Sequence, residues 1–451
     1  MNTELKSVDD IPGSLGLPIL GNFVDVFRHQ ELFYWQRYWQ HGKIFKMRFL
    51  GENYVVLVGP EASRLVLKDR ADKFSSRLGW KTLKPILSED MVLLQDGAEH
   101  KTSRRLILPI FHQQAIASYF ETMKYLVESA VADWGKQGTI NLDAELRKLT
   151  LTVAVQIFLG SQKIDEVAQV RDWFNTLMSK ANSAIVKWDV PFTAHGQGQA
   201  ARRHIIEYIL KVIQERQERG DLDNAEDVLG LFLHTVDEDG RKFTEMQVAN
   251  QALGFLFAAH ETTATLMSWL LFELGNRPQW REKLRDEYHG VVRNGEIEMP
   301  HLRQLSQMTN VLKEGERLYP PLEMMLRGVL EDIEIEGYLI PAGWNVMVAT
   351  LFTHRLPEVY AEPDLFDPDR FAPPRAEDTK QPYSLIGFGG GAHSCIGVEF
   401  AKMEMKLILG ILLDNYDLVS DPLPDGVEYP VRRMVETVPK LTAKLTPLDR
   451  G

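Results

Sequence analysis

Several features that would place a protein in a definite class are missing from this chain of 451 residues. It has one cysteine, which excludes an intrachain disulfide framework and is typical of a protein kept in a reducing compartment. The first residues are polar, without the apolar core of a secretory signal, and no run of about eighteen apolar residues occurs anywhere. We therefore expect a cytoplasmic protein with no transmembrane anchor.

Positive charge is also in short supply. The 51 Lys and Arg residues stand against 63 Asp and Glu, a formal net charge of −12, which argues against broad nucleic-acid binding. Repeats, low-complexity tracts and an obvious interdomain linker are absent from the sequence as well. With 44% hydrophobic residues the chain has material for a large core. We expect one domain over residues 1–451, with a Pro/Gly-rich hinge within residues 1–22.

Helical periodicity dominates the hydrophobic pattern that is present. It predicts helices over residues 60–68, 98–113, 116–134, 142–160, 166–181, 199–219, 277–290, 308–318 and 396–414. The strongest pattern runs from Thr244, which forms a capping box with Gln247, to Gly275. Its middle is apolar on nearly every face, so this helix should be buried and central. Strands are predicted over residues 43–50, 54–58, 333–339 and 346–350. The expected class is mostly α with a minor, segregated β part.

A glycine-rich stretch with the only cysteine precedes the last predicted helix. It reads Phe388-Gly-Gly-Gly-Ala-His-Ser-Cys395-Ile-Gly397. Glycines let a backbone approach a flat group closely, and a helix N-terminus stabilises a thiolate. The alternatives are an inert buried cysteine and a phosphate-binding loop, although the Walker pattern is absent. The spacing favours a reactive or ligating cysteine.

Three further sets of polar residues carry possible chemistry. Glu314 and Arg317 share one helix face, which taken alone predicts a solvated surface ion pair. Glu261 and Thr262 lie in the apolar middle of the long helix, where they are either internally satisfied or serve to relay protons. His100 and Arg104 share a face of their helix, and they either form an ordinary basic helix end or bind a buried anion.

The cysteine stretch resembles, position for position, the haem-binding loop of the cytochrome P450 family. The resemblance implies haem b as cofactor and Cys395 as the axial ligand of its iron, a thiolate that favours O–O cleavage. It also implies that His393 contacts a haem propionate, that Phe388 packs near the cysteine and that Gly397 completes the loop.

The other sets match family motifs in the same order. Glu314 and Arg317 with Arg370 resemble the structural triad that locks the region around the haem loop. Glu261 and Thr262 resemble the acid–alcohol pair that helps deliver protons to dioxygen, although Ala259 stands where the family usually has glycine. The resemblance further implies propionate contacts for His100, Arg104 and Arg327.

The implied function is a monooxygenase that inserts one oxygen atom of O2 into a lipophilic substrate such as a fatty acid, terpenoid, retinoid or sterol. Electrons would come from a separate ferredoxin or flavodoxin with its reductase, which an exposed patch would dock. A peroxide-driven enzyme of the same fold and a non-catalytic haem protein are the alternatives. The acid–alcohol pair argues against the first and a large apolar pocket against the second. The candidate docking residues are Lys101, Arg105, Lys402 and Lys406.

The substrate pocket should be apolar and lined largely by two irregular stretches, residues 72–95 and 182–198. Its candidate residues are Trp80, Leu83, Ile86, Trp188, Phe192, Phe255, Ala258, Leu322 and Met325, with residues 433–435 as a further candidate segment. The Pro/Gly hinge, the His-type haem helix and the Pro320-Pro321-Leu322 segment favour a retinoid- or sterol-type branch of the family.

Overall fold

The computed structural model describes residues 5–29, 31–160, 163–181, 188–220, 228–293, 295–423 and 440–448. Its helices are α1 (Phe23–His29), α2 (Glu31–His41), α3 (Pro60–Arg64), α4 (Ser76–Gly79), α5 (Gly97–Ile107), α6 (Gln113–Gln137), α7 (Leu142–Leu159), α8 (Ile164–Ala181), α9 (Ala194–Arg219), α10 (Val228–His234), α11 (Glu245–Gly275), α12 (Pro278–Val291), α13 (Ser306–Leu318), α14 (Thr350–Thr353), α15 (Glu377–Lys380) and α16 (Val398–Asn415). None of the helices in these ranges is long and apolar enough to cross a membrane.

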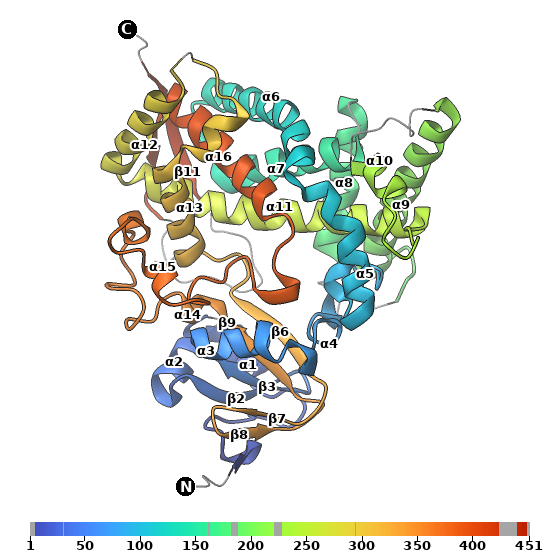
Figure 1. Cartoon of the computed structure of the whole chain (residues 1–451), viewed down its shortest axis with the longest axis vertical. Coiled ribbons are helices and arrows are strands. Elements are labelled where there is room, and N and C mark those ends of the chain that lie inside the picture. The colour runs from blue at the N-terminus through green and yellow to red at the C-terminus, as the bar shows by residue number, and fades with distance from the viewer. Residues whose placement is uncertain are drawn as a thin grey trace.

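The strands form three small sheets. They are β1 (Lys6–Ser7), β2 (Ile44–Phe49), β3 (Glu52–Leu57), β4 (Phe74–Ser75), β5 (Thr139–Asn141), β6 (Met324–Val329), β7 (Ile333–Ile335), β8 (Tyr338–Ile340), β9 (Asn345–Ala349), β10 (Tyr416–Ser420) and β11 (Thr442–Pro447). The five-stranded sheet has the order β2-β3-β9-β6-β4, and β1-β8-β7 lies beside it at the N-terminal end of the molecule (Figure 1). The third sheet, β10-β11-β5, lies within the helical part. The predicted class is confirmed.

Helix α11 crosses the middle of the helical part, as its apolar sequence predicted (Figure 1). It contacts α7, α9, α10, α12, α13 and α16. The capping box is present, because the Gln247 amide donates to Thr244 Oγ1 at 3.2 Å and the Thr244 amide donates to Gln247 Oε1 at 3.0 Å. Burial on most faces of α11 makes it the element against which the rest of the helical core packs.

Several predicted boundaries were wrong for identifiable reasons. The helix predicted over residues 98–113 ends at Ile107, since Pro109 cannot donate a helical hydrogen bond, and a 3₁₀ turn follows. The helix predicted from residue 199 begins at Ala194, because the Thr193 hydroxyl caps it by accepting from the Gly196 amide at 3.0 Å. The predicted hinge is tied to the sheet edge: the Lys46 amide donates to Pro12 O at 2.8 Å and Ile11 is buried.

Candidate functional site

The glycines before Cys395 allow two backbone segments to touch. Gly391 has φ +62°, and a Cβ there would collide with the carbonyl oxygen of Leu67. A Cβ at Gly390 would stand 2.6 Å from a ring carbon of Tyr383. Only glycine combines that backbone conformation with this approach. The glycine-rich pattern therefore fixes the loop against the Leu65–Asp69 turn and directs the chain to the start of α16.

Cys395 itself is held by its backbone and open at its side chain. Its amide donates to Phe388 O at 2.8 Å, and the residue is exposed. Burial nevertheless raises the pKa of the thiol, opposed by the Gly397 amide and the Arg104 guanidinium, which lower it. A ligand can therefore reach this residue, while the dense surroundings make the thiol hold its proton more firmly. A metal cation would displace that proton.

Two histidines from different elements stack beside the loop. The rings of His100 on α5 and His393 lie 3.8 Å apart between centroids, with planes inclined by 24°. Burial lowers the pKa of His100 to about 4 and that of His393 to about 3, with further lowering by nearby arginines. Both rings are therefore neutral at pH 7 in the protein alone and can donate one hydrogen bond each.

Two arginines complete a cationic cluster around these rings. Arg104 donates to Ser394 O at 2.9 Å and to Ser394 Oγ at 3.2 Å, directly beside Cys395. Arg327 on β6 is buried and donates to Leu326 O, and burial lowers its pKa to about 10, opposed by Asp96. Over the residues that the structure describes, neither arginine nor either histidine forms an ion pair with a carboxylate. Buried guanidinium groups of this kind call for an anionic ligand.

The acid and the alcohol of α11 have separate partners. Thr262 Oγ1 donates to Ala258 O at 2.7 Å, and Ala258 is exposed between the half-buried Phe257 and Ala259, although the helix before Phe257 is buried. Glu261 forms an ion pair with Arg147 of α7, which also donates from Nε to both oxygens of Asp143 at 2.9 Å. An exposed alanine within a buried helix leaves open space against α11 at this turn.

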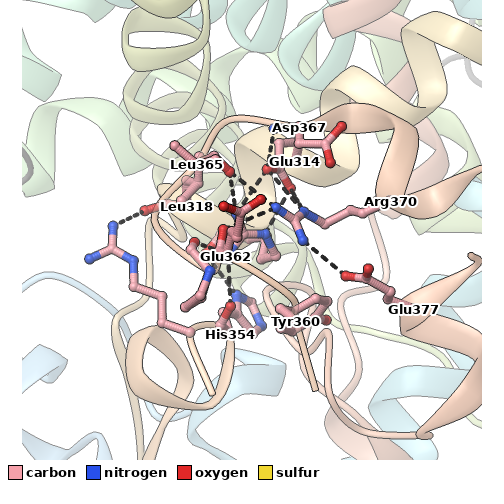
Figure 2. A network of polar contacts seen from close by, with 12 residues as sticks. Glu314, Leu318, His354, Tyr360, Glu362, Leu365, Asp367, Arg370 and Glu377 are labelled. Atoms are coloured by element: carbon pink, nitrogen blue, oxygen red, sulfur yellow. Dashed lines mark hydrogen bonds and ion pairs between the residues drawn. The ribbon is translucent and has the colours of Figure 1, made fainter. Parts of the chain in front are cut away.

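The Glu314–Arg317 pair is fully buried, in contrast to the surface ion pair that helix spacing taken alone predicts. Arg317 donates to Glu314 at 2.7 and 2.8 Å, and Arg370 Nε donates to Glu314 Oε1 at 3.2 Å. Figure 2 shows Arg370 between Glu314 and Glu377, and its Nη1 donates to Glu377 at 2.9 Å. The network connects α13 to the segment that leads to the Cys395 loop.

The predicted pocket residues are only partly brought together. Ile86 and Met325 are buried, Trp80 and Leu83 are half-buried, and Leu322 is exposed. A Cβ on Gly389 would stand 3.9 Å from Met325 Sδ, which places Met325 beside the Cys395 loop.

Phe255 is buried among other aromatic side chains. Its ring packs against Phe111, Phe158 and Phe232 at 5.4, 5.7 and 5.6 Å, on the α7 and α10 side of α11. Trp188 and Phe192 are exposed before α9, while residues 433–435 and 182–187 lie outside the described residues. The contribution of Phe255 is therefore to the helical core.

The predicted docking patch needs one correction. Lys406 is buried and donates from Nζ to Leu302 O at 2.6 Å, because its position on α16 faces the core. Lys101 is exposed, Lys402 pairs with Glu399 at 3.1 Å, and Arg105 lies 3.7 Å from Glu238.

The structure adds three residues that the motifs did not indicate: the half-buried Arg147 and the buried Glu316 and His354. Arg147 had a sequence signal, since Asp143 precedes it by four residues on a helix. Glu316 sits between the two members of the Glu-x-x-Arg pair, and nothing in the sequence showed that it faces the cysteine loop.

These surroundings fit a haem. An iron porphyrin with two carboxylates requires a ligand for its iron, partners for its carboxylates and open space above its plane. The site has an exposed cysteine, four cationic or hydrogen-bond-donating side chains without carboxylate partners in the described residues, and a small exposed residue on a buried helix. Cys395 would hold the iron, and His100, Arg104, Arg327 and His393 would hold the carboxylates.

Comparisons with known proteins agree with this fit. The family model for cytochrome P450 matches residues 11–441. The "Putative cytochrome P450 120" of Synechocystis is 30% identical over 415 residues, 92% of each chain. An "Abscisic acid 8'-hydroxylase 2" of Arabidopsis thaliana is 28% identical, covering 93% of this chain and 86% of its own.

A solved structure has the same fold. It is described as "Retinoic acid bound cyanobacterial CYP120A1" and matches 99% of this chain and 100% of its own with a TM-score of 0.89 and 29% identity. The chain belongs to the cytochrome P450 family of haem-dependent monooxygenases.

Proposed function

We propose that this enzyme inserts one oxygen atom of O2 into a retinoid-like carboxylic acid, with electrons supplied by a ferredoxin or flavodoxin and its reductase. The observation that carries the substrate class is the likeness over the whole chain to a protein described as bound to retinoic acid. Relatives named as abscisic acid hydroxylases support it. Retinoic and abscisic acids both join a methylated six-membered ring to a conjugated chain that ends in a carboxyl group.

Cys395 has the central role in holding the cofactor. The chemistry that haem supplies when bound is the reductive activation of O2. On the protein side, the Gly397 amide and Arg104 stabilise the thiolate form of Cys395, since both lower the pKa of the thiol. The Phe388 carbonyl accepts from the Cys395 amide and fixes the direction of the residue. This hydrogen bond therefore restricts the movement of Cys395 during turnover.

Glu261 and Thr262 are proposed to supply protons. Thr262 donates its own proton to Ala258 O, which leaves the lone pairs of Oγ1 to accept from a donor. The side chain of Glu261 is about one third exposed, at 32%, so its carboxylate can take up a proton from water. Arg147 holds that carboxylate through an ion pair and is paired with Asp143 at the same time, so Asp143 stays its partner when Glu261 is protonated.

The pocket is proposed to be formed by the 72–95 segment, Ala258, Leu322 and Met325. The segment is fastened to α9, because Gln199 donates to Pro85 O at 2.7 Å and Arg202 donates to Ile86 O at 3.3 Å. Apolar side chains at Trp80 and Leu83 suit a hydrocarbon ring and chain.

The test uses haem-loaded protein. Retinoic acid should produce a low-to-high-spin shift at lower concentration than hexadecanoic acid, and turnover with reduced ferredoxin and ¹⁸O2 should add one labelled oxygen atom to it. Turnover with peroxide alone would favour the peroxide-driven alternative. A spin shift with hexadecanoic acid and none with retinoic acid would refute the substrate class, and no product under any condition would favour a non-catalytic haem protein.

A further inference from the structure

Three consecutive backbone amides before the cysteine loop donate to buried side chains. The Ile386 amide donates to His354 Nε2 at 2.8 Å. The Gly387 and Phe388 amides donate to the carboxyl group of Glu316. His354 is fully buried and Glu316 is 7% exposed. The Phe388 carbonyl then accepts from the Cys395 amide, so this short segment is one hydrogen bond away from the cysteine.

Both acceptors are anchored to the C-terminal end of α13. Glu316 belongs to that helix, and His354 Nδ1 lies 3.3 Å from Arg317 O. Because Nε2 of His354 accepts a hydrogen bond, its ring is neutral and Nδ1 carries the proton that it donates to Arg317 O. Burial lowers the pKa of His354 to about 3, which keeps the ring neutral at pH 7.

Glu316 is costly to bury and has no ion pair within the described ranges. Burial raises its pKa to about 7, and the two amide hydrogen bonds, Lys402 and Lys313 lower it only in part. The backbone of Gly387 touches the Glu316 side chain, since a Cβ on Gly387 would collide with Glu316 Cγ. An apolar side chain at this position would leave the amides of the half-buried Gly387 and Phe388 without this acceptor. The contact with the loop is therefore what compensates this carboxyl group.

Glu316 acts separately from the triad on the same helix. The carboxylate of Glu314 is occupied by Arg317, Arg370 and the Asp367 amide at 2.8 Å, none of which belongs to the cysteine loop. In the part of the chain that the structure describes, the triad meets His354 only where Arg317 Nη1 donates to His354 O at 3.1 Å and His354 Nδ1 donates to Arg317 O. We propose that Glu316 and His354 form a clamp that positions the Cys395 loop, and thereby sets how firmly the cysteine sulfur stays on the haem iron. Both are positioning residues, because they act on the ligand through backbone amides.

The experiment follows the reduced, carbon monoxide-bound protein at matched haem content, and it needs no substrate. Thiolate ligation gives a strongly red-shifted Soret band, and its loss reports that the thiolate ligand has been lost or protonated. Glu316→Leu should accelerate that loss about tenfold, and Glu316→Gln about threefold, because the amide oxygen still accepts from the backbone.

The matched control is Glu404→Leu on α16. Glu404 is as deeply buried, burial raises its pKa, and one of its oxygens has no partner among the described residues. Its removal should leave the rate of loss unchanged. The proposal is overturned if Glu316→Leu loses the band at the wild-type rate, or if Glu404→Leu loses it equally fast. Should Glu316→Leu not retain haem, Glu316→Gln decides, and a wild-type rate in that variant overturns the proposal.

Discussion

Replacement of Glu314 by glutamine should destabilise the protein more than replacement of any other acid in its network. The side chains of Glu314, Arg317 and Arg370 are all 0% exposed. The glutamine has no charge, so the buried Arg317 loses its counter-charge and keeps only uncharged acceptors among the described residues. Breaking a buried ion pair by removing one charge costs about 3–5 kcal/mol. We expect a loss of that size in the free energy of unfolding.

Glu377→Gln is the matched comparison. Arg370 would keep Glu314 as its counter-charge, and the Glu377 side chain is 10% exposed, so the cost should be about 1–2 kcal/mol. Urea unfolding of the haem-loaded variants, followed by far-UV circular dichroism, measures both values. A loss under about 1 kcal/mol for Glu314→Gln, or a larger loss for Glu377→Gln, would refute the account of the triad.

Three further predictions concern proton supply, haem binding and the pH dependence of stability. Thr262→Ala should lower product formation about a hundredfold while O2 consumption continues and appears as hydrogen peroxide, and equal losses of both would contradict a proton role. Arg327→Leu should raise the rate of haem transfer to apomyoglobin at least about thirtyfold, whereas Lys101→Leu should not. Burial raises the pKa of Glu316 from 4.5 to about 7, so its stabilising contribution is present below pH 4.5 and lost as the pH rises through 7. The free energy of unfolding, measured by urea titration relative to Glu316→Gln, should fall by about 3 kcal/mol over that range, and a flat difference would contradict the shift.

The sequence predicted the central elements of the fold well, since their signals are local. The apolar middle of α11 and its capping box are readable from consecutive residues, and the structure contains both. Strand β6 escaped prediction because Arg327 and Gly328 interrupt its apolar run. Helix α2 also escaped prediction, because it is rich in Trp and Tyr, which favour strands as much as helices.

The site was predictable in its residue types and less so in its packing. Helical spacing showed that Glu314 and Arg317 are neighbours, but their burial depends on Arg370 and on backbone carbonyls far along the chain. Lys406 was placed wrongly because a basic residue on a helix does not reveal which neighbour it faces. The roles of Glu316 and His354 depend on contacts across 71 and 32 residues, which no local pattern encodes.

The central claim is that Cys395 ligates haem iron as a thiolate. The most direct measurement is the difference spectrum of the reduced, haem-loaded protein with and without carbon monoxide. The account predicts a strongly red-shifted Soret band for the native chain and its absence in Cys395→His, which should still bind haem through imidazole. A native protein that is folded and haem-loaded but lacks the shifted band, or a Cys395→His variant that keeps it, would contradict the assignment.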